Sequence, residues 1–527
     1  MKKFKIIRKF RIFIAIAVLA VTSFVFLDIY QVIPDSFVRG ILSTQFLPSF
    51  INMVFAGGIV FGGFLIIGLL TLAFGRVYCS TLCPFGILID VIIFIKRKIK
   101  KRVRFKFIKA KAGIPYFILG LSIVVLLLGS IQLFSLLDPY SNFGRIQTLV
   151  IKPILISLNN LIYDILITVN NYSLHPIEAA PANIPVSVFV IIFFISIVMI
   201  SLIKGRLFCT HVCPVGTSLG LLSKLSIVKV RIDDSLCTSC GACESKCKAG
   251  CISAKDKKVD FSRCVMCMDC LTVNCPVDAI DFSKKPKQNK IVQAEVVEVD
   301  NTRRKALLSL TVLPILMAGA AKASIKKKFI PEENITADNP DHRVVPISPP
   351  GSLNHNHFTD TCTSCYLCVN VCPSNVITPS LFEYGLKGIG LPQLTNKKGY
   401  CNYECTKCTD VCPNGALLPV SVDEKKTLQL GVAHFVRDLC VVITDKTDCG
   451  ACSEHCPTKA VNMVIENGLF VPVVDESICV GCGACEFACP VTPKKAIFVE
   501  GHKVHKVADK PKLEKLEEVD LEEDFPF

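Results

Sequence analysis

The chain has 527 residues, of which 29 are cysteine and none is tryptophan, and it carries a formal net charge of +15. Apolar residues make up 51% of the chain and its mean hydropathy is +0.50. This combination excludes an ordinary soluble domain and an intrinsically disordered chain. A chain of this length accommodates three or four domains of about 150 residues each, so membrane and soluble parts can coexist in it.

The positive charge is concentrated in two short runs. Residues 1–11 carry six basic side chains and residues 96–111 carry ten, and neither run holds an acidic residue. Removing these sixteen from the 59 basic residues leaves 43 against 44 acidic ones. Both runs adjoin apolar segments, where Lys and Arg mark the cytoplasmic side of a membrane. The sequence therefore predicts membrane lipid as a partner and no nucleic acid.

Four apolar segments predict membrane spans, at residues 12–27, 49–75, 112–137 and 179–203. The last three hold no charged residue and exceed the roughly 20 residues that cross about 30 Å of hydrocarbon. The first follows a basic head like that of a signal peptide, but no small-residue cleavage site follows it, so we expect a retained span. With both basic runs in the cytoplasm, the chain returns to the cytoplasmic side after the fourth span.

A further apolar segment, 146–174, is interrupted by Lys152 and Asp164. We expect it to lie in the outer interface or to re-enter the membrane rather than to span it. A full crossing here would reverse the topology of everything downstream.

A fifth span is predicted in mid-chain. Arg303 and Arg304 precede a moderately hydrophobic run that closes with Ala318-Gly319-Ala320, which is the pattern of a twin-arginine export signal. Such signals are N-terminal, so its position predicts a fusion of two ancestral chains in which the old signal serves as a span. The alternative is a buried amphipathic helix between two soluble domains. With a fifth span, the C-terminal part lies outside the cytoplasm.

The cysteines after the fourth span have the spacing of a bacterial two-cluster ferredoxin, in which the fourth cysteine of each run binds the other cluster. The predicted ligands of the two [4Fe-4S] clusters are Cys237, Cys240, Cys243 and Cys275, and Cys264, Cys267, Cys270 and Cys247. Cys251 is left over, and we expect a buried free thiol there, with an extra ligand as the alternative.

The C-terminal part repeats this pattern, with sixteen cysteines that predict four more clusters. The four runs are Cys362, Cys365, Cys368, Cys372; Cys401, Cys405, Cys408, Cys412; Cys440, Cys449, Cys452, Cys456; and Cys479, Cys482, Cys485, Cys489. Runs of three close cysteines with a distal fourth disfavour zinc. The pairing stays open. Nested pairing joins the first run with the fourth and the second with the third, and sequential pairing joins neighbouring runs.

Four remaining cysteines lie in an internal repeat, residues 75–86 (GRVYCSTLCPFG) and 205–216 (GRLFCTHVCPVG). Cys79, Cys83, Cys209 and Cys213 are candidates to bind a cofactor, since cysteines at i and i+4 share one face of a helix. Three roles remain open for them. They ligate a further iron–sulfur centre, they act as redox-active or cofactor-contacting thiols, or they merely pack in a structural turn. We expect the paired Arg76 and Arg206 to snorkel at the interface, with complementation of a cluster's charge as the alternative. We expect His211 to be a hydrogen-bonded helix-end residue rather than a ligand.

The predicted fold is a polytopic α-helical membrane protein of four or five spans with α+β bacterial-type 2[4Fe-4S] ferredoxin domains. We expect a four-span membrane domain with both cysteine repeats at residues 1–225 and a cytoplasmic two-cluster ferredoxin at 226–285. A linker and fifth span follow at 286–325, and an extracytoplasmic four-cluster polyferredoxin fills 326–527.

These motifs carry a family resemblance. Residues 1–285, with four spans, two C-x3-C-P repeats and a two-cluster ferredoxin, resemble the NapH-type membrane subunit of periplasmic nitrate reductase systems, related to NosR and MauN. Residues 301–527, with the twin-arginine segment, residues 348–351 (SPPG), Phe358 and the run from Cys362, resemble the NapG/MauM-type extracytoplasmic ferredoxin. The resemblance implies a quinol dehydrogenase module of anaerobic respiration in the inner membrane that passes electrons to an extracytoplasmic redox partner.

Three functions remain open at this point. The first is oxidation of the quinone pool's quinol; the second is an outward conduit from a cytoplasmic ferredoxin-like donor; the third is a redox sensor or maturation factor. A quinone site needs a proton-exchanging group near the interface, and the predicted outer loop contains five candidates. We expect each of them to be an ordinary solvated loop residue. The candidates are Asp138, Tyr140, Arg145, His175 and Glu178.

Overall fold

The computed structural model describes residues 2–55, 62–99, 105, 107, 113–178, 183–273, 275–283 and 343–511. The chain forms two compact units. In the described residues, the first unit comprises the chain up to residue 283 together with residues 351–393 and 407–419, and the second comprises residues 343–350, 394–406 and 420–511. The predicted fifth span, with Arg303 and Arg304, lies outside the described residues.

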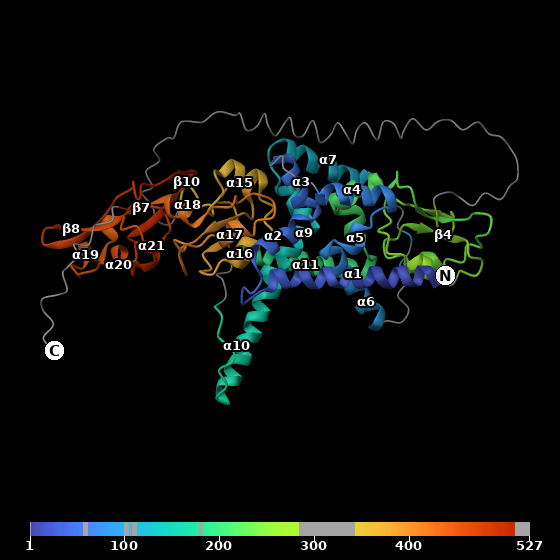
Figure 1. Cartoon of the computed structure of the whole chain (residues 1–527), viewed down its shortest axis with the longest axis horizontal. Coiled ribbons are helices and arrows are strands. Elements are labelled where there is room, and N and C mark those ends of the chain that lie inside the picture. Colours follow the sequence, from blue (N-terminus) through green and yellow to red (C-terminus); the bar gives the residue numbers. More distant parts are fainter. Residues whose placement is uncertain are drawn as a thin grey trace, which may run out of the picture. The chain divides into compact units, whose positions relative to one another are not determined.

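The N-terminal part of the first unit is helical (Figure 1). Its helices are α1 (Lys2–Leu27), α2 (Asp35–Ser43), α3 (Phe46–Phe55), α4 (Gly62–Phe74), α5 (Tyr78–Thr81), α6 (Pro84–Ile99), α7 (Gly113–Leu127), α8 (Gln132–Leu137), α9 (Pro139–Ile146), the π-helix η2 (Gln147–Ile151), α10 (Lys152–Thr168), α11 (Ile184–Lys204), the π-helix η3 (Phe208–Val212) and α12 (Pro214–Ser223). Three stretches of helix are long and apolar enough to cross a membrane: Phe4–Leu27, Pro139–Thr168 and Ile184–Lys204.

The predicted spans are found in two forms. Those at 12–27 and 179–203 are single helices of spanning length, α1 and α11. The segment 112–137 is divided into α7 and α8, because the chain turns at Gly129, whose φ of +79° no α-helix contains. The segment 49–75 supplies α4 and most of α3, and residues 56–61 lie outside the described residues. In the described residues, two of the four predicted spans are therefore single helices of spanning length.

The segment 146–174 forms a longer helix than we expected of an interfacial or re-entrant segment. It belongs to one continuous helix, α9–η2–α10, that is long enough to cross a membrane, and α10 extends away from the other helices (Figure 1). The ammonium group of Lys152 donates to the carbonyl oxygen of Asn370 at 2.8 Å, which satisfies the charge that interrupts the apolar pattern. The chain then returns along the same helix, because the Asn160 side chain bonds both backbone groups of Ile177.

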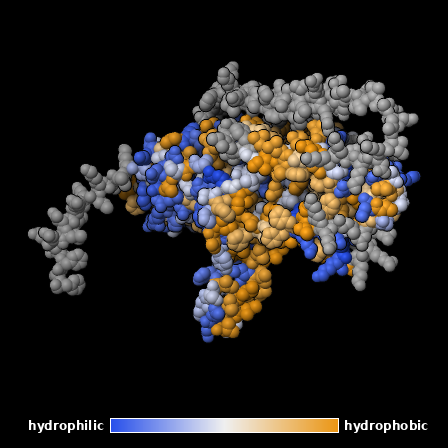
Figure 2. Space-filling model, turned by 45° about the vertical axis from the view of Figure 1, so that its right-hand side comes forward, coloured by the Kyte–Doolittle hydropathy of each residue, from blue (hydrophilic) through white to orange (hydrophobic). Residues whose placement is uncertain are grey.

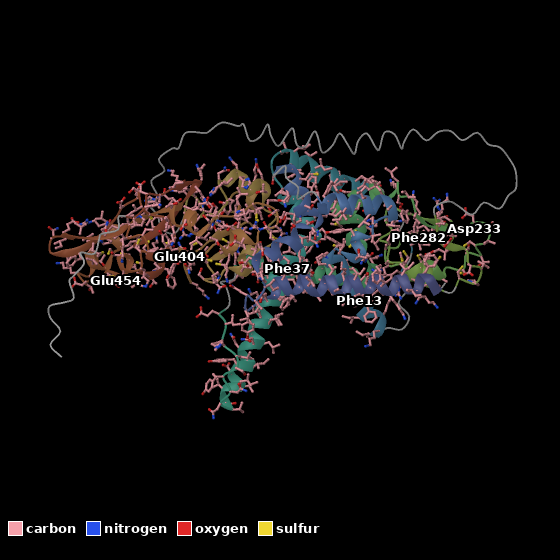
Figure 3. The ribbon with its side chains drawn as sticks, viewed as in Figure 1. Phe13, Phe37, Asp233, Phe282, Glu404 and Glu454 are labelled. Atoms are coloured by element: carbon pink, nitrogen blue, oxygen red, sulfur yellow. The ribbon has the colours of Figure 1, made fainter. Side chains whose placement is uncertain are left out.

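Large apolar side chains are exposed along these helices, as expected of a surface that faces lipid. Phe13 on α1 is 71% exposed and Phe37 on α2 is 57% exposed, and both are labelled in Figure 3. Hydrophobic residues cover the helical middle of the molecule and much of α10 (Figure 2). A membrane location follows from this surface together with the three long apolar helices.

The first ferredoxin segment, residues 229–283, is built of short strands around its cysteine loops. Its elements are β1 (Lys229–Ile232), α13 (Ala242–Lys246), β2 (Ile252–Ser253), β3 (Lys258–Val259), the 3-10 helix η4 (Asp269–Thr272) and β4 (Ile280–Ser283). β1 pairs antiparallel with β4, and β2 with β3. The backbone N–H of Arg206 donates to the carbonyl of Lys248 at 2.9 Å, which joins this segment to the end of α11.

The second ferredoxin segment, residues 351–393 and 407–419, also packs on the helices of the first unit. Its elements are α15 (His355–Thr361), α16 (Leu367–Val371), β5 (Ile377–Pro379), the 3-10 helix η5 (Leu386–Gly388), β6 (Pro392–Leu394) and α17 (Lys407–Asp410). β5 pairs with β6. The Asn52 side chain donates to the Pro413 carbonyl at 2.8 Å, and the Asn183 side chain donates to the Pro379 carbonyl at 2.8 Å.

Helices α1 and α11 each have the first ferredoxin segment near one end and the second ferredoxin segment near the other. On α1, Arg8 pairs with Asp269 at 2.8 Å, and Gln31, just beyond the other end, donates to the Val371 carbonyl. On α11, Asn183 precedes the first turn and Arg206 follows the last, with the contacts given above. The 21 residues of α11 span about 31 Å. The two ferredoxin segments therefore lie at opposite ends of helices of membrane-spanning length.

The second unit is a separate α+β body. Its elements are α18 (Val422–Thr427), β7 (Leu428–Phe435), the 3-10 helix η6 (Arg437–Leu439), α19 (Val441–Thr444), α20 (Ala451–Glu454), β8 (Val461–Glu466), β9 (Leu469–Val474), α21 (Ala484–Ala488) and β10 (Ile497–Val507). β7 pairs antiparallel with β10, and β8 with β9. The carboxylate of Glu486 bonds Asn396 at 2.9 Å and the Val499 N–H at 2.9 Å, which ties α21 to the sheet.

Substitution of Gly205 should loosen the first ferredoxin segment. This residue has a φ of +71°, and a Cβ there would lie 2.4 Å from the Lys248 carbonyl oxygen. We expect Gly205→Ala to cost more than the roughly 1–2 kcal/mol of left-handed strain alone, seen as a lower unfolding temperature in detergent and faster protease release of residues 229–283. Gly385→Ala is the control, since its φ is +69° with open space around it. Equal effects of both variants would contradict the docking role.

Candidate iron–sulfur sites and the membrane cysteine repeat

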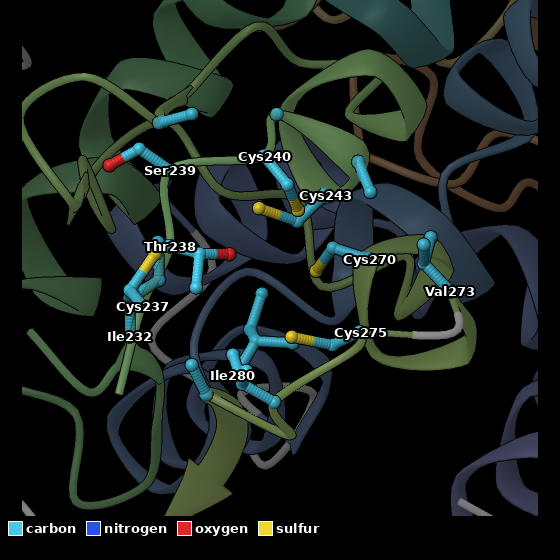
Figure 4. A pocket seen from close by; sticks show the side chains of 15 residues that line it. Ile232, Cys237, Thr238, Ser239, Cys240, Cys243, Cys270, Val273, Cys275 and Ile280 are labelled. Carbon is cyan, nitrogen blue, oxygen red and sulfur yellow. The ribbon is translucent and has the colours of Figure 1, made fainter. Parts of the chain in front are cut away.

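The first predicted set of ligands is brought together by the structure. Cys237, Cys240, Cys243 and Cys275 line one pocket of the first ferredoxin segment (Figure 4). Cys275 lies 32 residues after Cys243 in the chain, and the pairing of β1 with β4 returns it to the loop. The distal cysteine of one run therefore joins the three close cysteines of the other, as the ferredoxin pattern predicts.

The second predicted set lines a neighbouring pocket with Cys247, Cys264, Cys267 and Cys270. Cys270 contributes to the walls of both pockets. Cys251, which we expected to be a buried free thiol, is 1% exposed and its sulfur lies 3.4 Å from that of Cys247. The hydrogen bond between them lowers the pKa of Cys247. Cys251 thus supports a predicted ligand through this bond.

Four of the six cysteine loops share an unusual backbone. The residue before the second cysteine of a run, and the residue after it, have positive φ. Such positions are Ser239 and Gly241, Met266 and Met268, Ser364 and Tyr366, and Gly481 and Gly483. Alternating left-handed residues turn successive N–H groups toward one point and form a nest that binds anions. A cluster held by thiolates is such an anion, so the loops fit it in shape and polarity.

The structure favours sequential pairing in the C-terminal cysteine runs. Cys412 lines a pocket with the three close cysteines of the first run, Cys362, Cys365 and Cys368. Nested pairing instead places Cys412 with the third run, far along the chain. Sequential pairing follows from the short connection between the first two runs.

The same exchange recurs in the second unit. Cys489 lines a pocket with Cys440, Cys449 and Cys452. Burial raises the pKa of the Cys482 thiol to about 12, and the neighbouring thiols of Cys401, Cys456 and Cys479 act in the same direction. The thiols of Cys479, Cys482 and Cys485 therefore have Cys456 beside them, as sequential pairing requires. The remaining cysteines of the first two runs stay predicted iron–sulfur ligands: Cys372, Cys401, Cys405 and Cys408.

The donor chemistry of these pockets fits iron. Burial raises the pKa of Cys243 to about 11 and that of Cys267 to about 12, so these thiols hold their protons unless a cation replaces them. In the described residues, no three His, Cys, Asp or Glu side chains converge on a single ion. Thiolates at the corners of a four-iron cube each bind a different iron atom, so they stand farther apart than the ligands of one ion.

The membrane cysteine repeat forms a second kind of candidate site. Burial raises the pKa of Cys213 well above its usual value, and Cys209, Cys79 and Cys83 all add to this rise. The four thiols of the two repeats are therefore neighbours. In each copy the Cys-Pro-x-Gly turn begins a helix: the N–H of Gly86 donates to the Cys83 sulfur at 3.3 Å, and that of Gly216 donates to the Cys213 sulfur at 3.2 Å.

Two arginines are exchanged between the repeats. Arg76 donates to the Cys209 carbonyl at 2.7 Å, and Arg206 donates to the Cys79 carbonyl at 2.7 Å. Arg76 is 1% exposed and Arg206 is not exposed at all. The expectation that they snorkel at the interface was wrong, because both guanidinium groups lie in the middle of the repeat. His211 is half-buried and shares a hydrogen bond of 2.8 Å with Thr210, as expected of a helix-end residue.

A charged network joins the repeat to the first ferredoxin segment. Arg206 pairs with Asp90 at 2.8 Å, and Lys248 lies between Asp90 at 3.4 Å and Asp269 at 3.1 Å. Although burial opposes it, the attraction of Arg206 and Lys248 holds the pKa of Asp90 at about 2. Arg76 also donates to the Ser262 carbonyl of that segment at 3.1 Å. The repeat and the Cys264 loop are thus held against each other by buried polar contacts.

At the other end of the helices, the candidate quinone-site residues differ in their exposure to solvent. Asp138, Tyr140 and Arg145 are all at most 3% exposed, whereas His175 and Glu178 are exposed. Asp138 caps α9 by accepting from the Ser141 N–H at 2.7 Å. The expectation of solvated loop residues was therefore wrong for the first three: Tyr140 and Arg145 contact the second ferredoxin segment, and Asp138 is buried at the start of α9.

Sequence reasoning missed Gln132 and Ser135, which donate to the carbonyls of Cys362 and Thr363. Neutral residues in an apolar segment give no signal of such a contact.

Comparisons with known families agree with the cysteine pattern. A profile described as a 4Fe-4S binding domain matches residues 55–102 and 186–232, the two copies of the membrane repeat. Profiles described as 4Fe-4S dicluster domains match residues 361–417 and 447–492. Each of these spans two neighbouring runs, as sequential pairing requires. The chain contains ferredoxin-type iron–sulfur domains. It is an iron–sulfur electron-transfer protein.

Curated relatives cover part of the chain. "Ferredoxin-type protein NapF" of Escherichia coli is 27% identical over 157 residues, 30% of this chain and 87% of that protein. "Ferredoxin-type protein NapG" of the same species is 29% identical over 28% of this chain and 66% of its own length. "Methylamine utilization ferredoxin-type protein MauM" of Methylobacillus flagellatus is 31% identical over 27% of this chain and 63% of its own length. No solved structure matches the chain significantly.

A double substitution tests the pairing. If Cys362 and Cys412 bind one cluster, Cys362→Ala and the double variant Cys362→Ala/Cys412→Ala each lose about four iron atoms per chain. Nested pairing assigns the two cysteines to different clusters, so the double variant would then lose about eight. Iron and acid-labile sulfide counts on purified protein distinguish the outcomes. Cys362→Ala/Cys489→Ala is the reciprocal control, with about eight lost under sequential pairing and about four under nested pairing.

Proposed function

We propose that the protein oxidises quinol in the membrane and passes the electrons to a partner oxidoreductase outside the cytoplasm. Six [4Fe-4S] clusters are held by the ferredoxin cysteines, with a further iron–sulfur centre at Cys79, Cys83, Cys209 and Cys213. Such centres supply one-electron carriers to the fold that binds them. Oxidation of one quinol releases two electrons and two protons, so electrons pass on one at a time while protons are released to the surrounding water.

The observation that carries the proposal is the position of the ferredoxin segments at opposite ends of α1 and α11. With the N-terminal basic run in the cytoplasm, the Arg8–Asp269 contact at 2.8 Å belongs to the cytoplasmic end. The Asn183–Pro379 contact then belongs to the outer end. This supports an extracytoplasmic second ferredoxin segment, and a fifth span within 286–325 supplies the crossing that the chain needs.

Buried positive charge supports a negatively charged centre at the membrane repeat. Arg11, which is 7% exposed, donates to the Ser80 carbonyl at 2.7 Å, and Arg76 donates to the Cys209 carbonyl and lies 3.7 Å from the Cys79 sulfur. In the described residues, Asp90 pairs with Arg206 and is also attracted by Arg11, whereas Arg76 forms no ion pair. Burying cations without a counter-charge costs several kcal/mol. Four thiolates supply that charge, and packed neutral thiols do not.

The second candidate function is an outward conduit fed by a cytoplasmic ferredoxin-like donor. The specific observation in its favour is the contact of the first ferredoxin segment with the membrane repeat through Arg76 and Lys248. The same contact serves quinol oxidation if the cytoplasmic clusters receive electrons from the membrane. The direction of electron flow therefore decides between the two functions.

Reconstitution in vesicles tests the quinol function. Holoprotein in liposomes that contain a reduced menaquinol or ubiquinol analogue should bleach its iron–sulfur absorbance, because the clusters accept the quinol's electrons. Retention of the oxidised spectrum with full iron content would contradict the proposal. Reduction by a cytoplasmic-type ferredoxin in quinone-free vesicles, with none by quinol, would establish the conduit instead.

Variants of the membrane repeat test the relay within the same assay. Cys79→Ala/Cys209→Ala should keep the ferredoxin iron but block reduction of the clusters beyond the repeat, with at least a tenfold loss of rate. Ser122→Ala is the control, since it removes a buried hydroxyl that bonds within α7 and lies outside the predicted ligand sets. An unchanged rate in the double variant would show that the repeat thiols only pack.

A further inference from the structure

The second ferredoxin segment meets the membrane helices through the loop between Cys362 and Cys365. Gln132 on α8 donates to the Cys362 carbonyl at 3.4 Å, and Arg145 on α9 donates to the Thr363 carbonyl at 3.2 Å and to the Ser364 carbonyl at 3.0 Å. A Cβ on Gly144 would lie 2.4 Å from the Cys365 carbonyl. Successive carbonyls of this loop thus face the helices, which leaves its N–H groups free to turn toward the cysteines.

Arg145 is a buried cation that forms no ion pair in the described residues, although the carboxylate of Asp138 attracts it. Its side chain is 3% exposed. Besides the two loop carbonyls, it bonds the Ser135 hydroxyl at 2.7 Å, and the carbonyl of Ser135 and the amide oxygen of Asn142 at 3.4 Å each. All of these hydrogen-bond acceptors are neutral. They reduce the cost of burying the charge, and an anion at the cysteine loop would offset more of it.

Tyr140 adds an unused donor at the same place. Its ring is 1% exposed and packs 6.2 Å from the ring of Phe26, centroid to centroid. Its hydroxyl lies beside the Cys365 thiol but has no hydrogen-bond partner of adequate geometry in the described residues. A buried hydroxyl without a partner costs about 1–3 kcal/mol, and a thiolate at Cys365 would relieve this cost.

We propose that α9 sets the reduction potential of the centre held by Cys362, Cys365, Cys368 and Cys412, with Arg145 as the positioning charge and Tyr140 as the hydroxyl donor. A fixed cation and a hydrogen bond to a ligand sulfur both stabilise the reduced, more negative state. This centre then accepts electrons at the membrane and delivers them to the second unit. The inference deepens the proposed function and rests on it for the direction of flow.

An equilibrium redox titration tests the potential directly. In purified full-length holoprotein, Arg145→Gln should shift one electron paramagnetic resonance component to lower potential. We expect at least a tenfold fall in its reduced-to-oxidised ratio at fixed potential, about 59 mV for a one-electron couple. Tyr140→Phe should move the same component in the same direction by less. Arg437→Gln is the control, because Arg437 is paired with Glu466 on an exposed surface of the second unit.

The component that moves is identified by Cys365→Ala, which should abolish it. Arg145→Lys is a second variant for the case in which Arg145→Gln loses iron. It keeps the positive charge, so we expect it to shift the reduction potential less than Tyr140→Phe does. Unchanged potentials in Arg145→Gln with full iron would overturn the inference. The inference would also be overturned if the component that shifts in Arg145→Gln were still present in Cys365→Ala. If Arg145→Gln loses iron, an unchanged reduction potential in Tyr140→Phe would overturn it. The titration uses mediators and no quinol, so its failure is distinct from failure of the vesicle assay.

Discussion

The exchange of Arg76 and Arg206 between the two membrane repeats is the contact on which the rest of the first unit depends. Each guanidinium leaves its own repeat and bonds the carbonyl of the first cysteine in the other. The exchange fixes the four cysteines as neighbours, seats Asp90 through Arg206, and brings the first ferredoxin segment against the helices through the Ser262 carbonyl. A glycine three residues after each second cysteine is required here, because a Cβ on Gly86 would lie 2.5 Å from the Cys79 carbonyl oxygen of its own repeat, and a Cβ on Gly216 would lie 2.3 Å from the Cys209 carbonyl oxygen.

The same physical device recurs at the other end of the helices. Arg145, like Arg76, is a buried arginine whose acceptors are backbone carbonyls of a cysteine loop. In both places a cation is buried beside thiols, and the proposed thiolate-held centres would supply negative charge to compensate it. Charge complementarity between helices and cysteine loops thus accounts for how a membrane domain holds ferredoxin segments at both of its ends.

Cysteine chemistry was predictable from the sequence, whereas burial of charge was not. The spacing of Cys237 to Cys275 fixes which thiols meet, because a ferredoxin loop permits few alternatives, and the structure gathers them in the predicted pockets. Pairing among the later runs depends on tertiary contact, so the spacing left two arrangements open. Arg76, Arg145 and Arg206 looked like surface residues because apolar neighbours give no sign of what covers them. The break at Gly129 was likewise hidden, since a lone glycine is common within membrane helices.

Sidedness of the chain before and after the predicted fifth span is the most direct test of the account. Alkaline phosphatase, which is active only outside the cytoplasm, can be fused after Lys290 and after Pro340 in otherwise intact upstream sequence. Two ferredoxin segments at opposite ends of membrane-length helices predict an inactive fusion at 290 and an active one at 340. Equal activity at both positions would place the two segments on one side of the membrane and contradict the transmembrane path.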